Sequence, residues 1–91
     1  MIPIITSEHL TLTPALKQDV DRHLEKLTPI LTQDSTLRAF LTVDRENHFQ
    51  VLFKTHLDHH DLIARKSSYD LHTALTRAYK SFRRLIIETK K

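Results

Sequence analysis

The chain contains no glycine, although average usage of about 7% would supply roughly six glycines in 91 residues. Glycine is the residue that most easily takes a positive φ, so its absence leaves the tight turns to Asn, Asp, Ser and Pro. The absence also excludes the glycine-rich loops that hold phosphates in P-loop and dinucleotide-binding proteins. A fold for this chain must therefore turn, and bind any ligand, without those devices.

Length and composition predict one globular domain over residues 1–91. The hydrophobic share of 40% and the charged share of 27% are ordinary for such a domain. Cysteine is absent, which excludes disulfides, thiolate nucleophiles and cysteine zinc sites. The longest apolar runs are three residues, and the N-terminus shows no signal peptide. We therefore expect a cytoplasmic protein with no membrane span.

The charge is unevenly distributed. Residues 1–64 hold six Lys/Arg and nine Asp/Glu, a net charge of −3, whereas residues 65–91 hold eight and two, a net charge of +6. Such asymmetry predicts one surface that faces a polyanion. Nucleic acid is the first candidate for that polyanion, and an anionic membrane surface is the second.

The first third of the chain predicts a strand and a helix. Residues 2–6 form a short apolar strand, in which Pro3 favours an edge position or the first residues. Thr13 followed by Pro14 is typical of a helix start. Pro29 is expected to end that helix near residue 27 or 28. Its apolar stripe consists of Leu16, Val20, Leu24 and Leu27.

The middle of the chain predicts three strands joined by polar turns. The strands are expected at residues 37–45, 49–55 and 62–66, where apolar residues alternate or cluster. The turns are expected at residues 34–35, 46–48 and 58–60. Asn47 is the residue best able to take a positive φ in the first hairpin.

The last element is the clearest helix. Ser68 or Asp70 can cap its start, and Asp70 also suits the positive end of the helix dipole. Its apolar stripe consists of Leu71, Ala74, Leu75, Ala78, Phe82, Leu85 and Ile86. The element order is then β-α-β-β-β-α. Because each helix has one apolar side, both are expected on one face of a single four-stranded sheet, an α+β two-layer sandwich.

The side of the last helix opposite this stripe is basic. It carries Arg77, Lys80, Arg83 and Arg84. Arg65 and Lys66 precede the helix and are expected to join this face. A solvated helix side often carries such residues with no partner, so a plain surface remains an alternative. The only carboxylates nearby, Asp70 and Glu88, are at the helix ends, which favours binding to phosphates.

Catalysis finds little support, and we expect no enzyme, cofactor or small-molecule substrate. His56, His59 and His60 lie near Asp58 and Asp61, but their spacing matches no established zinc pattern. A solvated turn is the simpler interpretation, with a small metal-dependent hydrolase on His56, His59, His60 and Asp61 as the alternative.

Three aromatic residues lie outside the predicted core. Phe40, on the polar side of its strand, suits either edge packing or a base-stacking platform. Tyr69, which precedes the last helix, is open to the same two interpretations. Tyr79 borders the apolar stripe, which favours a position at the rim of the core.

Several segments, taken in order, resemble one protein family. These are Ile5-Thr6-Ser7, residues 12–17 (LTPALK), residues 23–27 (HLEKL), Ile63-Ala64, residues 70–75 (DLHTAL) and Phe82-Arg83-Arg84. The chain resembles the bacterial ribosome hibernation promoting factors. These proteins are also called ribosome-associated translation inhibitors and, by an older name, sigma-54 modulation proteins. The resemblance covers nearly the whole chain.

The resemblance implies a fold and a function. The fold is a β-α-β-β-β-α domain similar to double-stranded RNA-binding domains. The implied function is stress-related inhibition of translation: the protein binds the small ribosomal subunit in the channel for messenger and transfer RNA and stores inactive ribosomes. A generic domain for structured RNA, without ribosome preference, is the alternative.

The resemblance also assigns residues. Lys17 and Lys26 match basic positions of the first helix, and Arg84 matches an arginine of the last. His23 stands where an arginine is common, and the family glycine of the last hairpin is missing, which implies a wider or strained turn. Ser67, His72, Ser81 and Glu88 also depart from the family pattern. The candidate RNA-binding residues are Lys17, His23, Lys26, Arg65, Lys66, Arg77, Lys80, Arg83 and Arg84.

The chain resembles the short form of the family, which lacks a C-terminal dimerisation domain. We therefore expect a monomer away from the ribosome.

Overall fold

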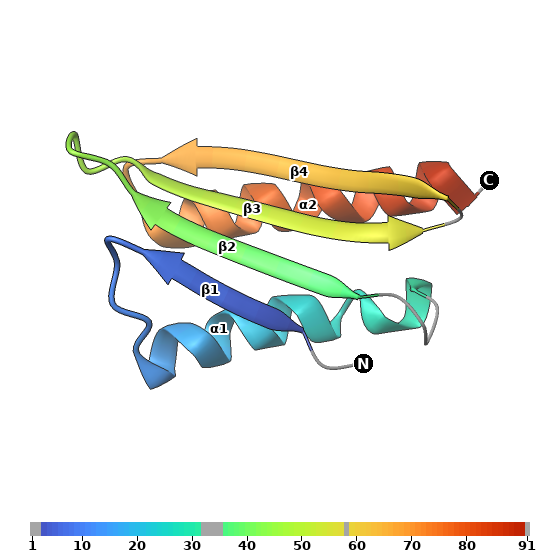
Figure 1. The fold of residues 1–91 in the computed structure, drawn as a ribbon, viewed down its shortest axis with the longest axis horizontal. Helices are drawn as coiled ribbons and strands as arrows, with labels where there is room; N and C mark the ends of the chain where they lie inside the picture. The colour runs from blue at the N-terminus through green and yellow to red at the C-terminus, as the bar shows by residue number, and fades with distance from the viewer. Residues whose placement is uncertain (1–2, 32–35, 58, 91) are drawn as a thin grey trace.

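The computed structural model describes residues 3–31, 36–57 and 59–90, with the backbone alone at Lys90. Apart from one short 3-10 helix, the elements follow the predicted order (Figure 1). They are β1 (Ile4–Glu8), α1 (Pro14–Glu25), the 3-10 helix (Thr28–Ile30), β2 (Leu37–Val43), β3 (Phe49–Leu57), β4 (His60–Ser68) and α2 (Leu71–Lys90).

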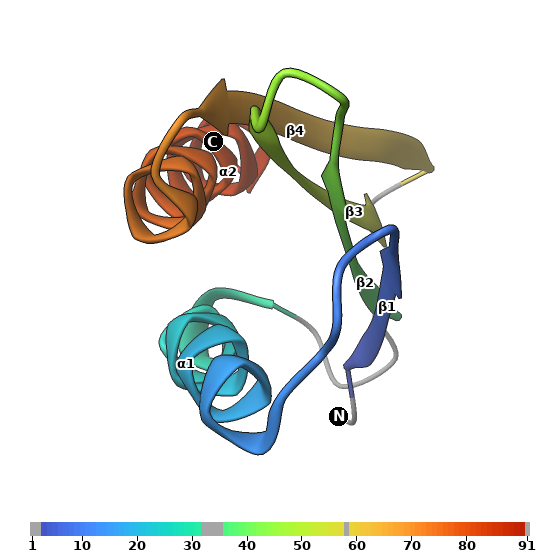
Figure 2. The same cartoon turned by 90° about the vertical axis from the view of Figure 1, so that its left-hand side faces the viewer.

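The four strands form one sheet in the order β1-β2-β3-β4. β1 runs parallel to β2, and the other neighbours are antiparallel. A parallel neighbour requires a crossover connection, and α1 lies in that connection. Both helices cover the same face of the sheet, and the opposite face is open (Figure 2). The α+β two-layer fold predicted from the periodicities is therefore confirmed.

The hydrophobic core fills the space between the sheet and the helices. Its two largest side chains are Phe53 of β3 and Phe82 of α2, both fully buried, with ring centroids 5.7 Å apart. Burying a ring of this size stabilises a fold by about 1.5–3 kcal/mol. This contact therefore holds α2 against the sheet. The predicted stripes supply the buried residues of both helices and also Leu27, which follows α1: Val20, Leu24, Leu27, Ala74, Leu75, Ala78, Phe82 and Ile86.

α1 begins as predicted and ends earlier. The Leu16 N–H donates to Thr13 Oγ1 over 3.1 Å, and Pro14 occupies the first turn. The helix ends at Glu25 rather than at residue 27 or 28. Pro29 has no N–H for an α-helical bond and disfavours a helical conformation at the preceding residue. The chain therefore tightens into the 3-10 helix that contains Pro29.

α2 begins at a double cap. Asp70 Oδ2 accepts hydrogen bonds from the hydroxyl and the N–H of Thr73, at 2.7 and 2.9 Å, and the Asp70 N–H donates to Ser68 Oγ. The Thr73 hydroxyl, and then the Thr73 N–H, lower the pKa of Asp70 below its ordinary value of 3.8. Both residues predicted as possible caps thus take part, in series.

The first hairpin turn confirms the prediction for Asn47, whose φ is 63°. Asp44 Oδ1 accepts hydrogen bonds from the N–H groups of Glu46 and His48, both at 2.9 Å. The His48 N–H is the main cause of the lowered pKa of Asp44. A left-handed residue and an acceptor side chain therefore build this turn without glycine.

The second hairpin is tight. Leu57 pairs with His60, which leaves two residues between the strands, and His59 has a φ of 68°. The expectation was a wider or a strained turn, and a left-handed histidine where a glycine would be easier corresponds to the strained alternative. His9, at a φ of 59°, is the third such residue in the described chain. Asp58 and the turn predicted at residues 34–35 lie outside the described residues.

All four strand predictions need correction. β1 starts after Pro3 and extends to Glu8, β3 extends to Leu57, and β4 has nine residues rather than the five expected. β2 ends at Val43, two residues early. The additional residues of β4 are polar, so no apolar pattern marks them. They are strand because the ladder to β3 continues from His60 to Ser68.

Among the described helices, none is long and apolar enough to cross a bilayer.

Candidate nucleic-acid interface

The outer side of α2 carries the predicted cations. Arg77, Lys80, Arg83 and Arg84 are all exposed, because Ala78 and Phe82 turn the opposite side of the helix into the core. In the part of the chain that the structure describes, the recorded ion pairs all involve histidine, and no Lys or Arg is paired with a carboxylate. The positive charge of this side is therefore available to a ligand.

A groove lies along this side of α2, next to the edge strand β4. It has a volume of about 390 Å³ and is lined by Lys66, Ser67, Arg77, Lys80, Ser81 and Arg84. A second hollow of about 400 Å³ continues along the helix and is lined by Lys80, Arg83, Arg84, Ile87 and Glu88. Cations beside small hydroxyl side chains are groups that hold phosphate oxygens. We call Lys66, Arg77, Lys80, Arg83 and Arg84 the α2 groove cations.

The structure separates the two basic residues that precede α2. Lys66 pairs in register with the buried Val51 and lies on the helix side of β4, where it lines the groove. Arg65 pairs with Leu52 on the other side of the sheet. Successive strand residues point to opposite faces. The expectation that both join the α2 face is thus correct for Lys66 and wrong for Arg65.

The candidate residues of α1 have mixed surroundings. Lys17 is exposed and lines a cleft of about 290 Å³ together with Asp21 and Glu25, two carboxylates of the same helix. Lys26 caps the end of α1, and its Nζ lies 5.7 Å from the centre of the Tyr79 ring of α2. The α1 cations thus face carboxylates or an aromatic ring, unlike those of α2.

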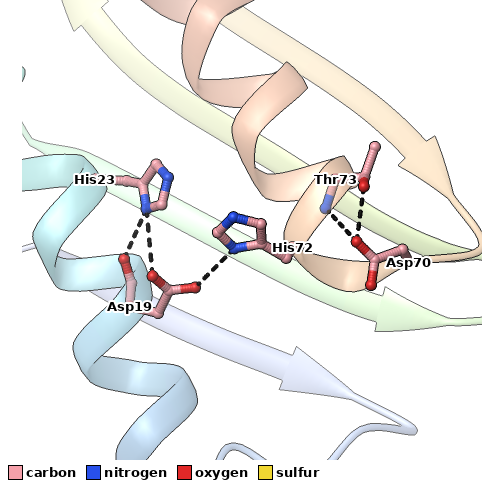
Figure 3. Close-up of polar contacts among 5 residues, drawn as sticks. All are labelled: Asp19, His23, Asp70, His72 and Thr73. Carbon is pink, nitrogen blue, oxygen red and sulfur yellow. Dashed lines mark hydrogen bonds and ion pairs between the residues drawn. The ribbon is translucent and has the colours of Figure 1, made fainter.

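The third α1 candidate, His23, lies in the seam between the helices (Figure 3). Its side chain is 12% exposed. His23 Nδ1 is 2.8 Å from the main-chain oxygen of Asp19, and because that oxygen only accepts, Nδ1 carries the hydrogen. The His23 ring meets Tyr79 edge-on at 5.5 Å. Most of its ring therefore packs between helices, which leaves little of it for RNA.

The seam contains two residues that sequence reasoning did not bring together. Asp19 Oδ2 of α1 lies 3.5 Å from His72 Nδ1 of α2 (Figure 3). His72 also meets the His23 ring at 6.2 Å. Neither contact has a local signal, because each depends on how the helices pack. Tyr79 is half-buried beside them, as its place at the rim of the stripe predicts.

Of the histidines near the second hairpin, His56 is paired with an aspartate. His56 Nδ1 lies 3.0 Å from Asp61 Oδ1 across β3 and β4, and this hydrogen bond lowers the pKa of Asp61. His59 and His60 are exposed. Among the described residues, which leave out Asp58, no group of three or more potential ligands is arranged to hold a metal ion.

Ser67 and Ser81 are groove residues that were not among the candidate binding residues. In the structure they line the groove beside the α2 groove cations. The spacing of Ser81 from Arg77 and Arg84, four and three residues, was a usable signal because it places all three on one side of a helix.

Comparison with known proteins shows which solved structures this fold resembles. No curated protein sequence matches the chain. The structure is similar to the Protein Y N-terminal domain of Thermus thermophilus, with a TM-score of 0.81 and 16% identity over 93% of this chain and 96% of that one. It is also similar to a ribosomal subunit interface protein from Coxiella burnetii, with a TM-score of 0.84 and 14% identity over 99% and 98%. At such identities, these likenesses establish the fold alone.

The family model described as "Sigma 54 modulation protein / S30EA ribosomal protein" matches residues 4–91, which is nearly the whole chain. The fold, the segments quoted above and this match agree. The chain therefore belongs to the sigma-54 modulation and S30EA ribosomal protein family, the hibernation factor family that it was found to resemble.

Proposed function

We propose that this protein is a ribosome-associated hibernation factor that binds the small ribosomal subunit and occupies the channel for messenger and transfer RNA. Inhibition is steric, and no bond is made or broken. The protein acts in the cytoplasm as a monomer until it binds. Family membership supports the association with ribosomes, as does the Coxiella burnetii relative, which is named a ribosomal subunit interface protein.

The observation that carries the proposal is the α2 groove. Its cations come from two elements, β4 and α2, and lie beside hydroxyl groups in a concave surface. Contacts between cations and phosphates supply most of the affinity of proteins for structured RNA, and they tolerate varied local geometry. Lys17 and Lys26 of α1 add charge on the neighbouring helix. His23 contributes mainly by packing.

The same groove favours one competing function. Because phosphate contacts carry no sequence information, a generic domain for structured RNA would use the same side chains. Competition separates the two: an excess of naked duplex RNA leaves a ribosome-specific factor on small subunits, whereas it removes a generic binder.

Co-sedimentation with purified small subunits across a salt series tests the proposal directly. We expect salt-sensitive binding that initiator transfer RNA displaces, because both ligands would occupy one channel. Changing Arg77, Lys80, Arg83 and Arg84 together to Glu should abolish binding, and removing a single phosphate-binding cation should reduce the salt slope by roughly 0.7–0.9. Binding that transfer RNA does not displace would contradict channel occlusion.

A matched control separates the groove from general charge. The double variant Arg77→Glu/Lys80→Glu reverses two groove cations, and Arg22→Glu/Arg45→Glu reverses two exposed cations outside the groove. Both carry the same net charge. We expect only the first to lose binding, and equal losses would mean that the groove is not the interface.

A further inference from the structure

The open face of the sheet presents two rows of side chains that strand register aligns. Residues that pair across neighbouring strands lie side by side, and alternate residues share a face. The first row is Thr6, Phe40, Leu52 and Arg65, and the second is Ile4, Arg38, Lys54 and Ile63. Figure 1 shows this face, with the helices behind it. Each of β2, β3 and β4 therefore places one cation next to one apolar side chain on this face, and β1 adds Ile4 and Thr6.

The open face is positively charged at its centre. Arg38, Lys54 and Arg65 lie on three adjacent strands and are exposed. The strand carboxylates on this face, within the described residues, are Glu8 on the edge strand β1 and Asp61 near the second hairpin. Asp61 is already hydrogen-bonded to His56. Within the described part of the chain, no ion pair joins these three cations to a carboxylate. Lys54 is near enough to Asp61 to help lower the pKa of that carboxyl, so the charge of Arg38 and Arg65 is the most available to an anionic ligand.

The same face has apolar surface that phosphates alone would not use. Ile4 and Ile63 are 47% and 49% exposed, and Phe40 and Leu52 of the other row are half-buried. Just beyond the paired ends of β3 and β4, Tyr69 is 70% exposed and its ring lies 4.1 Å from that of His48, tilted by 33°. Exposed rings and aliphatic side chains bind unstacked bases.

We propose that the open face of the sheet binds single-stranded RNA, separately from the α2 groove. A single strand offers bare base faces together with one phosphate per nucleotide, which matches a surface that holds apolar side chains and cations side by side. A duplex hides its base faces and would contact the cations only. An acidic amphipathic helix needs a continuous apolar stripe, and the cations of these rows interrupt such a stripe.

The two surfaces lie on opposite faces of one sheet. Lys66 lines the α2 groove and Arg65, its neighbour in sequence, belongs to the open face. The core separates these surfaces, so one molecule can hold structured RNA on its helices and an unpaired segment on its sheet. This inference rests on the open face alone and does not require the proposed function.

Fluorescence anisotropy with a labelled single-stranded RNA of roughly 10 nucleotides tests the inference. The variant Arg38→Glu/Lys54→Glu should bind at least about tenfold more weakly, whereas Arg77→Glu/Lys80→Glu, with the same net charge, should bind nearly as wild type does. The same sheet variant should still co-sediment with small subunits if the proposed function holds. Undetectable binding by the wild type, or equal losses in both variants, would overturn the inference.

Arg38 and Lys54 are direct cross-strand neighbours, so the reversed pair replaces one like-charge contact by another. The neutral variant Arg38→Gln/Lys54→Gln provides a second test in case the reversed pair fails to fold. It should also weaken binding, with an unchanged circular dichroism spectrum.

Removing rings separates base stacking from charge. Phe40→Leu keeps the apolar volume, and Tyr69→Phe keeps the exposed ring that Tyr69→Ala removes. We expect Phe40→Leu and Tyr69→Ala to weaken single-stranded binding several-fold, and Tyr69→Phe to bind as wild type does. Duplex RNA and polyglutamate should compete poorly with the single strand. If either competes as well as an unlabelled single strand, or if neither ring removal matters, the surface recognises charge alone and the inference is wrong.

Discussion

The two helices cover the same face of the sheet but differ in what they present to solvent. α1 has two Lys/Arg and three Asp/Glu among its 12 residues, whereas α2 has five and one among its 20. α2 also buries more of the core, including Phe82, while α1 buries Val20 and Leu24. The difference shows that in this domain the helix that buries more of the core also carries the unpaired positive charge on which the proposed function depends.

The largest difference should be in stability. Phe82→Ala on α2 removes a fully buried ring and should lower the free energy of unfolding by about 3–5 kcal/mol, against about 2–5 kcal/mol for Leu24→Ala on α1. Because the Phe82 ring also packs against Phe53, we expect its removal to fall near the top of that range. Urea denaturation measures both. A larger effect of Leu24→Ala would mean that α1, rather than α2, contributes more to stability.

Charge reversal on each helix gives the next largest effect. Arg83→Glu/Arg84→Glu on α2 should weaken small-subunit binding at least about tenfold, because unpaired cations are removed. Lys17→Glu/Lys26→Glu on α1 reverses the same number of charges, and we expect a loss of only a few-fold, since Lys17 already lies among carboxylates. Sedimentation at a fixed low salt concentration measures both pairs. Equal losses would show that the interface spans both helices evenly.

The two N-caps differ in how they respond to pH. Thr13→Ala should cost about 1 kcal/mol at every pH, because a hydroxyl cap does not titrate in the acid range. Asp70→Ala should cost more stability at neutral pH than in strong acid. The folded pKa of Asp70 is lowered, so its contribution is complete above about 3.8 and is lost as the pH falls through that lower folded value. Melting temperatures across this range would test the contrast, which a pH-independent effect of Asp70→Ala would contradict.

The smallest effect should come from the contact that joins the helices. Asp19→Asn removes the charge beside His72 and should lower the free energy of unfolding by about 0.5–1 kcal/mol, a few °C in melting temperature. Asp21→Asn, two residues along α1, is the matched control. If both variants melt at the same temperature, the contact between Asp19 and His72 contributes nothing to stability.

Local signals predicted most of the fold. Helix starts at Thr13-Pro14 and Asp70 follow from capping chemistry, and Asn47 is well suited to a left-handed turn. The polar ends of β4 could not be predicted, since they are strand only through pairing with β3. The 3-10 helix could not be predicted either, because its residues do not follow the α-helical period of 3.6.

The candidate site was predictable along α2 and not elsewhere. A helix places residues three and four apart on one side, so Arg77, Lys80 and Arg84 could be grouped from the sequence. The opposite facing of Arg65 and Lys66 also follows from strand alternation and was overlooked. The rows of the open face and the contacts of His23 with Tyr79 depend on register and on helix packing, which no local pattern encodes.

The parallel pairing of β1 with β2 has a consequence for the order in which the chain folds. Ile4 pairs with Arg38, and the whole of α1 separates these two residues in the sequence. By contrast, β2, β3, β4 and α2 each pack against an element that is next to them in the sequence. Contacts between sequence neighbours close short loops and form early; distant ones close long loops and form late. The strand that leaves the translating ribosome first is thus expected to dock last. Hydrogen exchange should find the amides of β1 less protected than those of β3.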